Sequence, residues 1–106
     1  MSEALVILCT CPDDAIAGRL ARSLVEQKLA ACVNIVPAIR SIYSWQGELC
    51  DDKEVLLVIK TLQSRFPELE AWLREHHPYD VPEVVALPAE QVSADYLAWI
   101  ASSVTP

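Results

Sequence analysis

The residues of this sequence best suited to chemistry are its thiols and imidazoles. They are Cys9, Cys11, Cys32, Cys50, His76 and His77. A thiolate is a soft ligand for Cu(I) or a borderline divalent ion, and imidazole is a common ligand of copper and zinc. Cys9 and Cys11 form a C-x-C pair, but no second pair exists to complete a four-cysteine zinc site. A cysteine beside a histidine base is also an arrangement that nucleophilic catalysis uses.

Each of these residues also has a purely structural interpretation. Cys9 ends an apolar run and would serve as a small core residue, while Cys32 lies in a β-branched run and is expected in the core. The two histidines would complement the C-terminus of a helix. The acidic group of Asp51, Asp52 and Glu54 could hold a hard cation, but such a group is more typical of the solvated start of a strand.

Composition limits the class of protein. The 106 residues are enough for one domain, spanning 1–106, and the 53% of hydrophobic residues can supply its core. The net charge is −7 and the eight basic residues are scattered, so we expect no nucleic-acid partner. Gly18 and Gly47 are the only glycines, and neither a GxGxxG turn nor a phosphate-binding loop can be written with them.

The sequence also predicts a cytoplasmic protein. No stretch approaches the ~18 apolar residues of a membrane span, so we expect no membrane partner. The N-terminal residues carry an acid and no basic region, which is unlike a secretory signal. In that compartment we expect the thiols to be reduced.

Four strands and three helices are predicted to position these side chains. Apolar or β-branched runs favour strands at 5–9, 30–36, 54–59 and 84–87. Amphipathic spacing favours helices from 12 to about 28, from 64 or 66 to 76, and after a cap at Ser93. Pro37 predicts a bulge or an edge position, and Gln46-Gly47 predicts a turn, so residues 31–61 should form one long hairpin.

The order of elements is βαββαβ plus a C-terminal helix, which is a ferredoxin-like α+β fold. Right-handed crossovers give the sheet order 4-1-3-2, with antiparallel neighbours and both crossover helices on one face. This topology brings the end of the first strand, with Cys9 and Cys11, to the edge where the second helix ends at His76 and His77. The tip of the hairpin points the same way.

Six segments, in order along nearly the whole chain, resemble the CutA divalent-cation tolerance proteins. They are LCTCPD at 8–13, KLAACVN at 28–34, IYSWQG at 42–47, IKT at 59–61, HHPYDVPE at 76–83 and DYLAW at 95–99. The resemblance implies a PII-like homotrimer that binds copper or other divalent cations. It implies Cys9, His76 and His77 as the copper ligands, and it assigns no role to Cys11 or Cys50.

We therefore expect a small cytoplasmic homotrimer that binds copper ion, takes part in divalent-cation tolerance and is not an enzyme. The hairpin aromatics Tyr43 and Trp45 are expected to contact a neighbouring subunit, since the hairpin is longer than the domain that it leaves. Two alternatives stay open. One is an enzyme with Cys9 as nucleophile, although no orienting acid or oxyanion feature is evident. The other is a PII-like signalling or scaffold protein that binds a small ligand at clefts between subunits.

Overall fold

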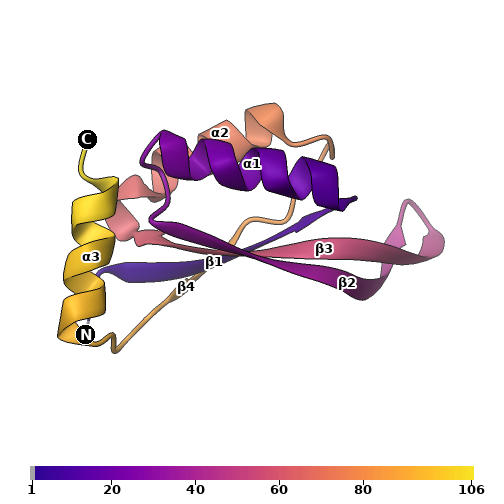
Figure 1. Ribbon diagram of the computed structural model, residues 1–106. Coiled ribbons are helices and arrows are strands. Elements are labelled where there is room, and N and C mark those ends of the chain that lie inside the picture. Colours follow the sequence, from indigo (N-terminus) through magenta and orange to yellow (C-terminus); the bar gives the residue numbers. More distant parts are fainter. Residues whose placement is uncertain (1) are drawn as a thin grey trace.

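The chain forms four strands and three helices, and its two longest strands follow each other as one hairpin (Figure 1). The computed structural model describes residues 2–106. The elements are β1 (Ala4–Cys11), α1 (Asp14–Glu26), β2 (Cys32–Trp45), β3 (Glu48–Leu62), a 3-10 turn (Gln63–Arg65), α2 (Phe66–His76), β4 (Val85–Pro88) and α3 (Ala94–Val104). This is the predicted βαββαβα order.

The four strands form one sheet in the order β2-β3-β1-β4, and every neighbouring pair is antiparallel. Ile7 at the centre of β1 is paired with Ile59 of β3 on one side and with Ala86 of β4 on the other. The predicted order 4-1-3-2 is therefore confirmed. It follows that the C-terminal end of β1 lies beside the segment that joins α2 to β4.

Helices α1 and α2 cover one face of the sheet (Figure 1). Alternate residues of β1 and β3 turn to this face, because successive side chains of a strand point to opposite sides. They form the main core with the apolar stripes of the two helices, whose buried members include Leu20, Leu24, Leu69 and Leu73. Helix α3 lies across one end of the sheet, where Ile100 and Val104 pack with Ala4 and Ala31.

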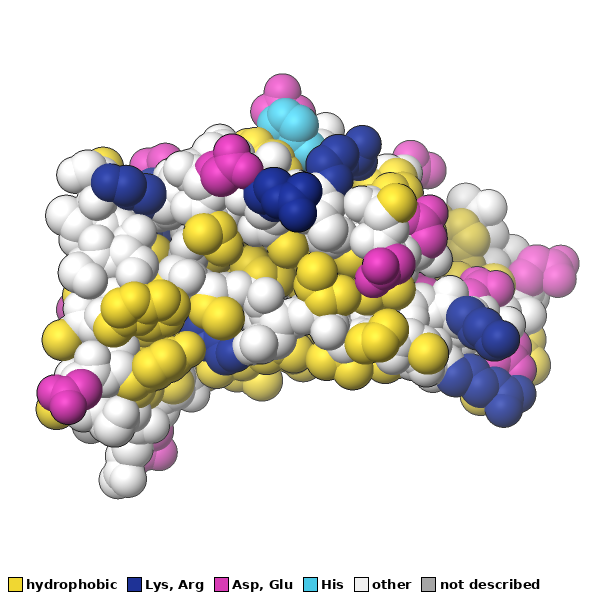
Figure 2. Space-filling model, in the orientation of Figure 1, with side chains coloured by type: hydrophobic (Ala, Val, Ile, Leu, Met, Phe, Trp, Pro, Cys, Tyr) yellow, Lys and Arg dark blue, Asp and Glu magenta, His cyan; other side chains and the backbone are white. Residues whose placement is uncertain are grey.

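The opposite face of the sheet carries apolar side chains and no helix. Its members are Val6, Leu8, Val36, Leu56, Val58, Val85 and Leu87, all half-buried or exposed. Hydrophobic side chains are also visible at the surface over the strands in Figure 2. The sheet therefore has one apolar face that the helices α1 and α2 do not cover.

The predicted long hairpin over residues 31–61 is confirmed, and its strands extend beyond the apolar runs at 30–36 and 54–59. β2 continues through Pro37 to Trp45, with a bulge between Val36 and Ile39, and β3 begins at Glu48. The predicted irregularity at Pro37 and the turn at Gln46-Gly47 are both confirmed. The hairpin runs out beyond the helices (Figure 1), which explains the elongated shape of 44 × 25 × 22 Å.

Three local predictions need correction. Cys32 is half-buried rather than in the core, because its position in β2 places it on the face without helices. Ser93 occupies the N-cap position of α3, but its side chain makes no capping hydrogen bond. Helix α1 ends at Glu26, two residues early, because Lys28 adopts a left-handed conformation with φ of 59°.

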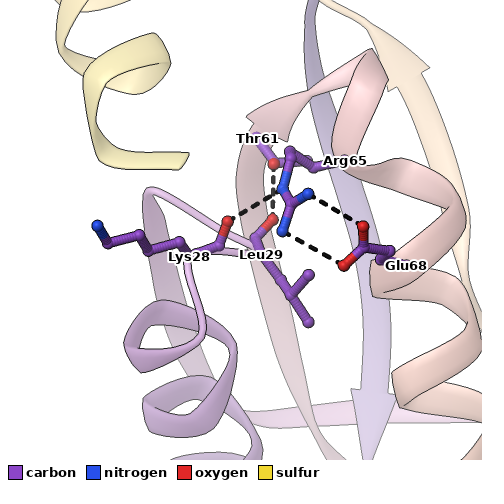
Figure 3. A network of polar contacts seen from close by, with 5 residues as sticks. All are labelled: Lys28, Leu29, Thr61, Arg65 and Glu68. Carbon is purple, nitrogen blue, oxygen red and sulfur yellow. Dashed lines mark hydrogen bonds and ion pairs between the residues drawn. The ribbon is translucent and has the colours of Figure 1, made fainter. Parts of the chain in front are cut away.

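Hydrogen bonds and one ion pair connect the loop after α1 with β3 and with the start of α2 (Figure 3). The hydroxyl of Thr61 donates a buried hydrogen bond of 2.7 Å to the Leu29 carbonyl. The Arg65 guanidinium donates to the Lys28 carbonyl at 3.2 Å and forms an ion pair with Glu68. These bonds give hydrogen-bond partners to two backbone carbonyls of the loop that follows α1.

In the part of the chain that the structure describes, no helix combines the length and the apolar character needed to cross a bilayer.

Candidate metal centre

The end of β1 presents two thiols to the same side of the sheet. Cys9 and Cys11 are two residues apart, so the alternation of the strand turns both side chains toward the helices. Both side chains are fully buried. Cys11 is opposite Val55 and Cys9 is opposite Leu57 in the adjacent strand β3, which fixes the direction of the two thiols.

His77 approaches this pair from the end of α2. The residue before a proline is pushed out of helical geometry, and His77 before Pro78 is extended, with φ of −75° and ψ of 141°. The change of direction turns its imidazole into the protein, where the residue is buried. Cys9, Cys11 and His77 each offer one ligand atom, and these atoms lie within 4.8 Å of one another.

The imidazole of His77 is held by backbone groups on both of its nitrogens. Its Nε2–H donates to the Thr10 carbonyl at 2.8 Å, and its Nδ1 accepts from the Tyr79 N–H at 3.1 Å. This pair of contacts fixes the neutral tautomer with the proton on Nε2. A metal that bound His77 would have to displace one of these two hydrogen bonds.

His76 points away from the cluster. It remains within the last turn of α2, its side chain is exposed, and its Nδ1–H donates to the Trp72 carbonyl at 2.9 Å. Its ring also stacks on the Trp72 ring, with centroids 4.4 Å apart. The structure thus brings Cys9 and His77 together, as the sequence predicted, and leaves His76 outside. Only His77, directly before Pro78, leaves helical geometry, while His76 remains in α2.

Cys11, and not His76, is the third member of this group of ligand atoms. The family resemblance implied no role for Cys11, although its spacing of two from Cys9 on a buried strand was a usable signal. The other two cysteines lie on the long hairpin, outside the group of three ligand atoms.

The three side chains shift one another's acidity. The pKa of Cys9 is raised, first by its interaction with the neighbouring Cys11 thiol and second by burial. The pKa of Cys11 is lowered by that same interaction, which outweighs burial, and the nearby imidazole of His77 lowers it further. Burial opposes protonation of His77, but the Cys11 thiol and the hydrogen bond to the Thr10 carbonyl outweigh it, so its pKa is raised. The arrangement favours one thiolate, at Cys11, next to the imidazole.

The acidic group of the hairpin forms no comparable cluster. Asp51 forms an ion pair with Arg40 at 2.6 Å, and Asp52 accepts a hydrogen bond of 2.6 Å from the Tyr43 hydroxyl. Both are exposed and lie within β3, in agreement with the solvated strand that we preferred to a hard-cation site. Glu54 is different, since it is buried and accepts a hydrogen bond of 2.5 Å from the Tyr79 hydroxyl.

Comparisons with known proteins agree on one family. A sequence model of the family described as CutA1 divalent ion tolerance protein matches residues 5–103. A divalent-cation tolerance protein CutA of Thermus thermophilus is 50% identical over 95 residues, which cover 90% of this chain and 92% of that protein. A CutA homolog of Xenopus laevis is 54% identical over 86% of this chain, but the match covers only 60% of the longer Xenopus protein.

The fold is shared with solved structures as well. The structure of a protein from Archaeoglobus fulgidus, described as periplasmic divalent cation tolerance protein CutA, superposes with a TM-score of 0.93 at 35% identity. The match covers 96% of this chain and 99% of that one.

Proposed function

Because the chain belongs to the CutA1 divalent ion tolerance family, we propose that it contributes to cation tolerance by binding copper at Cys9, Cys11 and His77. The observation that carries this proposal is the convergence of two buried thiols and one imidazole within 4.8 Å. Sulfur and imidazole donors suit copper better than magnesium or calcium, which prefer oxygen. At a site of this kind the Irving–Williams order places Cu(II) above the other divalent ions of the first transition row.

The ligand set differs from the one that the family resemblance implied. Cys9 and His77 are kept, Cys11 is added, and His76 is not a ligand within the same subunit. A fourth position would be taken by water or by a group of another subunit. Because a metal must break a hydrogen bond of His77 and displace the proton of Cys9, we expect modest affinity and ready exchange.

Binding rather than catalysis is the role that the site supports. A histidine base is normally oriented by a third polar group while its other nitrogen faces the nucleophile. Here both nitrogens of His77 are engaged by the backbone of Thr10 and Tyr79. We therefore propose that the protein is not an enzyme.

The proposed assembly is a homotrimer. Two features of the described chain favour association: the apolar sheet face that no helix covers, and a hairpin that extends beyond its own domain. A cytoplasmic location is proposed as well, since reducing compartments keep thiols free and all four cysteines are free. The Archaeoglobus relative is described as periplasmic, so cell fractionation should be used to test this location.

The test of the metal site is copper titration of matched variants. Cu(I) is titrated under reducing conditions against a chromophoric chelator, and Cu(II) is followed by calorimetry. We expect Cys9→Ser, Cys11→Ser and His77→Gln each to weaken Cu(I) binding at least tenfold. Cys50→Ser and His76→Ala are the controls, and both should bind as the unchanged protein does.

Two outcomes would contradict this assignment. If all variants bind copper alike, the three residues serve packing alone. If His76→Ala weakens binding as much as His77→Gln does while Cys11→Ser does not, the ligand set implied by the family resemblance is the right one.

A further inference from the structure

The imidazole of His77 is held by a residue two positions further along the chain. The Tyr79 backbone N–H donates a hydrogen bond of 3.1 Å to Nδ1 of His77, and the centroids of the two rings lie 4.7 Å apart. The other nitrogen, Nε2, carries the proton and donates to the Thr10 carbonyl at 2.8 Å. In this tautomer the lone pair that a metal could use is the one on Nδ1, which Tyr79 occupies.

Tyr79 is itself anchored to the long hairpin. Its hydroxyl donates a hydrogen bond of 2.5 Å to the carboxylate of Glu54, and a hydrogen bond to a charged group is stronger than one between neutral groups. Glu54 is the first buried residue of β3, after the exposed residues 51–53. Tyr79 therefore joins a proposed metal ligand at one end to a buried carboxylate of the hairpin at the other.

A metal on either nitrogen of His77 removes the acceptor of the Tyr79 N–H. If the metal binds at Nδ1, it takes the lone pair directly. If it binds at Nε2, the proton of the neutral imidazole must move to Nδ1, and an Nδ1–H cannot accept a hydrogen bond. The hydrogen bond from Tyr79 to Nδ1 is thus incompatible with a metal on His77, whichever nitrogen is used.

The Tyr79 N–H must move once this acceptor is lost. Its partial positive charge is repelled by a protonated nitrogen or by a metal cation, and a partly buried N–H without a partner is costly. The hydroxyl of the same residue, however, is held by Glu54. Movement of the backbone N–H away from His77 therefore acts against the bond at the other end of Tyr79.

We propose that Tyr79 and Glu54 form a latch, a contact that keeps His77 in its metal-free hydrogen bonding and that copper must break. The proposal rests on the proposed copper function, because it concerns the regulation of the same site. The closed latch lowers copper affinity. Since coupling between two binding equilibria is reciprocal, bound copper in turn weakens the contact between Tyr79 and Glu54. Occupation of the metal site is thereby communicated to the hairpin strand β3.

Tyr79→Phe opens the latch without changing a charge. It removes the hydroxyl that binds Glu54 and keeps the ring, the backbone N–H and the carboxylate. In competition with a chromophoric chelator under reducing conditions, we expect Tyr79→Phe to bind Cu(I) at least fivefold more tightly than the unchanged protein does. A gain of affinity separates the latch from a merely structural role, which would weaken binding or leave it unchanged. Tyr96→Phe on α3 is the control and should bind as the unchanged protein does.

Hydrogen exchange of the Tyr79 amide, followed by NMR, tests the latch in the unchanged protein and needs no variant. The amide should exchange slowly without metal and at least tenfold faster with one equivalent of Cu(I) per subunit, because its acceptor is lost. The Ala31 amide, which donates to the Lys60 carbonyl at 2.9 Å, is the internal control and should keep its rate.

Two results would overturn the latch. They are Cu(I) binding by Tyr79→Phe that is no tighter than that of the unchanged protein, and a Tyr79 amide that stays protected when copper is bound. If either occurs while Cys9→Ser weakens copper binding, the latch alone is wrong and the copper site stands. If the unchanged protein binds no copper, or if Cys9→Ser binds it equally well, the proposed function fails and the latch fails with it.

Discussion

Cys9 and Cys11 share one face of one strand, yet the structure gives their thiols opposite acidities. Cys9, whose pKa is raised, keeps its proton, and Cys11, whose pKa is lowered, loses its proton more easily. A metal ion would replace the donated proton of Cys9 and bind both sulfurs. The dithiol is therefore arranged so that copper and protons compete for it.

Copper affinity should accordingly rise with pH across the neutral range. Cys9, with its raised pKa, carries a proton that copper must displace at every pH in this range. The pKa of His77 is raised above its ordinary 6.5, so competition from its proton begins at a higher pH than for a free histidine. The apparent affinity for Cu(I) should fall by tenfold or more per pH unit as pH drops from 8 to 6, because at least one proton is displaced.

Chelator competition at several pH values would measure this dependence, with a chelator of known acidity. His76→Ala is the control and should leave the slope unchanged. A flat profile between pH 6 and pH 8 would show that no proton is displaced, which would contradict the role of the Cys9 thiol.

Residue orientation was the least predictable part of the site. The sequence located the edge at which Cys9 and the histidines meet, because topology alone decides it. It could not decide which histidine turns inward, since that depends on the backbone angles of the single residue before Pro78. His76 stacks on Trp72, four residues earlier in α2, and bonds its carbonyl. These contacts on the exposed side of the helix compete with an inward orientation of the His76 ring.

At the scale of elements, the tip of the hairpin requires an unusual backbone. Gln46 and Gly47 both have positive φ, of 49° and 81°. This is the geometry of the two-residue turn that best matches the twist of a hairpin. Glycine adopts it without steric cost, whereas other residues do so less readily.

The two single variants Gly47→Ala and Gly18→Ala should have opposite effects on stability. Gly47→Ala should lower the free energy of unfolding by about 1 kcal/mol, because an L-residue is strained at this φ. No atom lies within 4 Å of the added Cβ, so the cost is conformational. Gly18→Ala in α1 also meets open space, and it should raise stability by about 0.5–1 kcal/mol through helix propensity.

Urea unfolding at one fixed protein concentration compares the two variants, since association changes the apparent stability. A neutral or stabilising Gly47→Ala would show that the tip does not need the positive φ.

The elements were predictable where their patterns are local. Apolar runs, proline and amphipathic spacing placed all strands and helices, and the strand order followed from chirality. The hairpin over residues 31–61 was predicted as well, from Pro37 and the turn at Gln46-Gly47. Residues 48–53 themselves carried no strand pattern, because they are mostly exposed on both faces. A strand without a buried face has no alternating pattern to detect.

At the scale of the whole molecule, several large apolar side chains are exposed to solvent in the single chain. The bare sheet face and the hairpin tip together expose Val85, Leu87, Ile42 and Trp45. Contiguous surfaces of this kind mark sites of association. The net charge of −7 favours solubility, and the apolar surface is where the proposed trimer would form its contacts.

Trp45→Ala should weaken assembly far more than it weakens the fold of one subunit. Trp45 is 44% exposed in the single chain, so its removal leaves no core cavity, but a large aromatic residue at a contact often dominates the binding energy. Sedimentation over a dilution series should show dissociation at a concentration at least tenfold higher for Trp45→Ala. Trp99→Ala, which removes a tryptophan of 45% exposure from α3, is the matched control and should assemble normally. A stable monomer of the unchanged protein at micromolar concentration, or equal dissociation of the two variants, would refute a contact made by the hairpin.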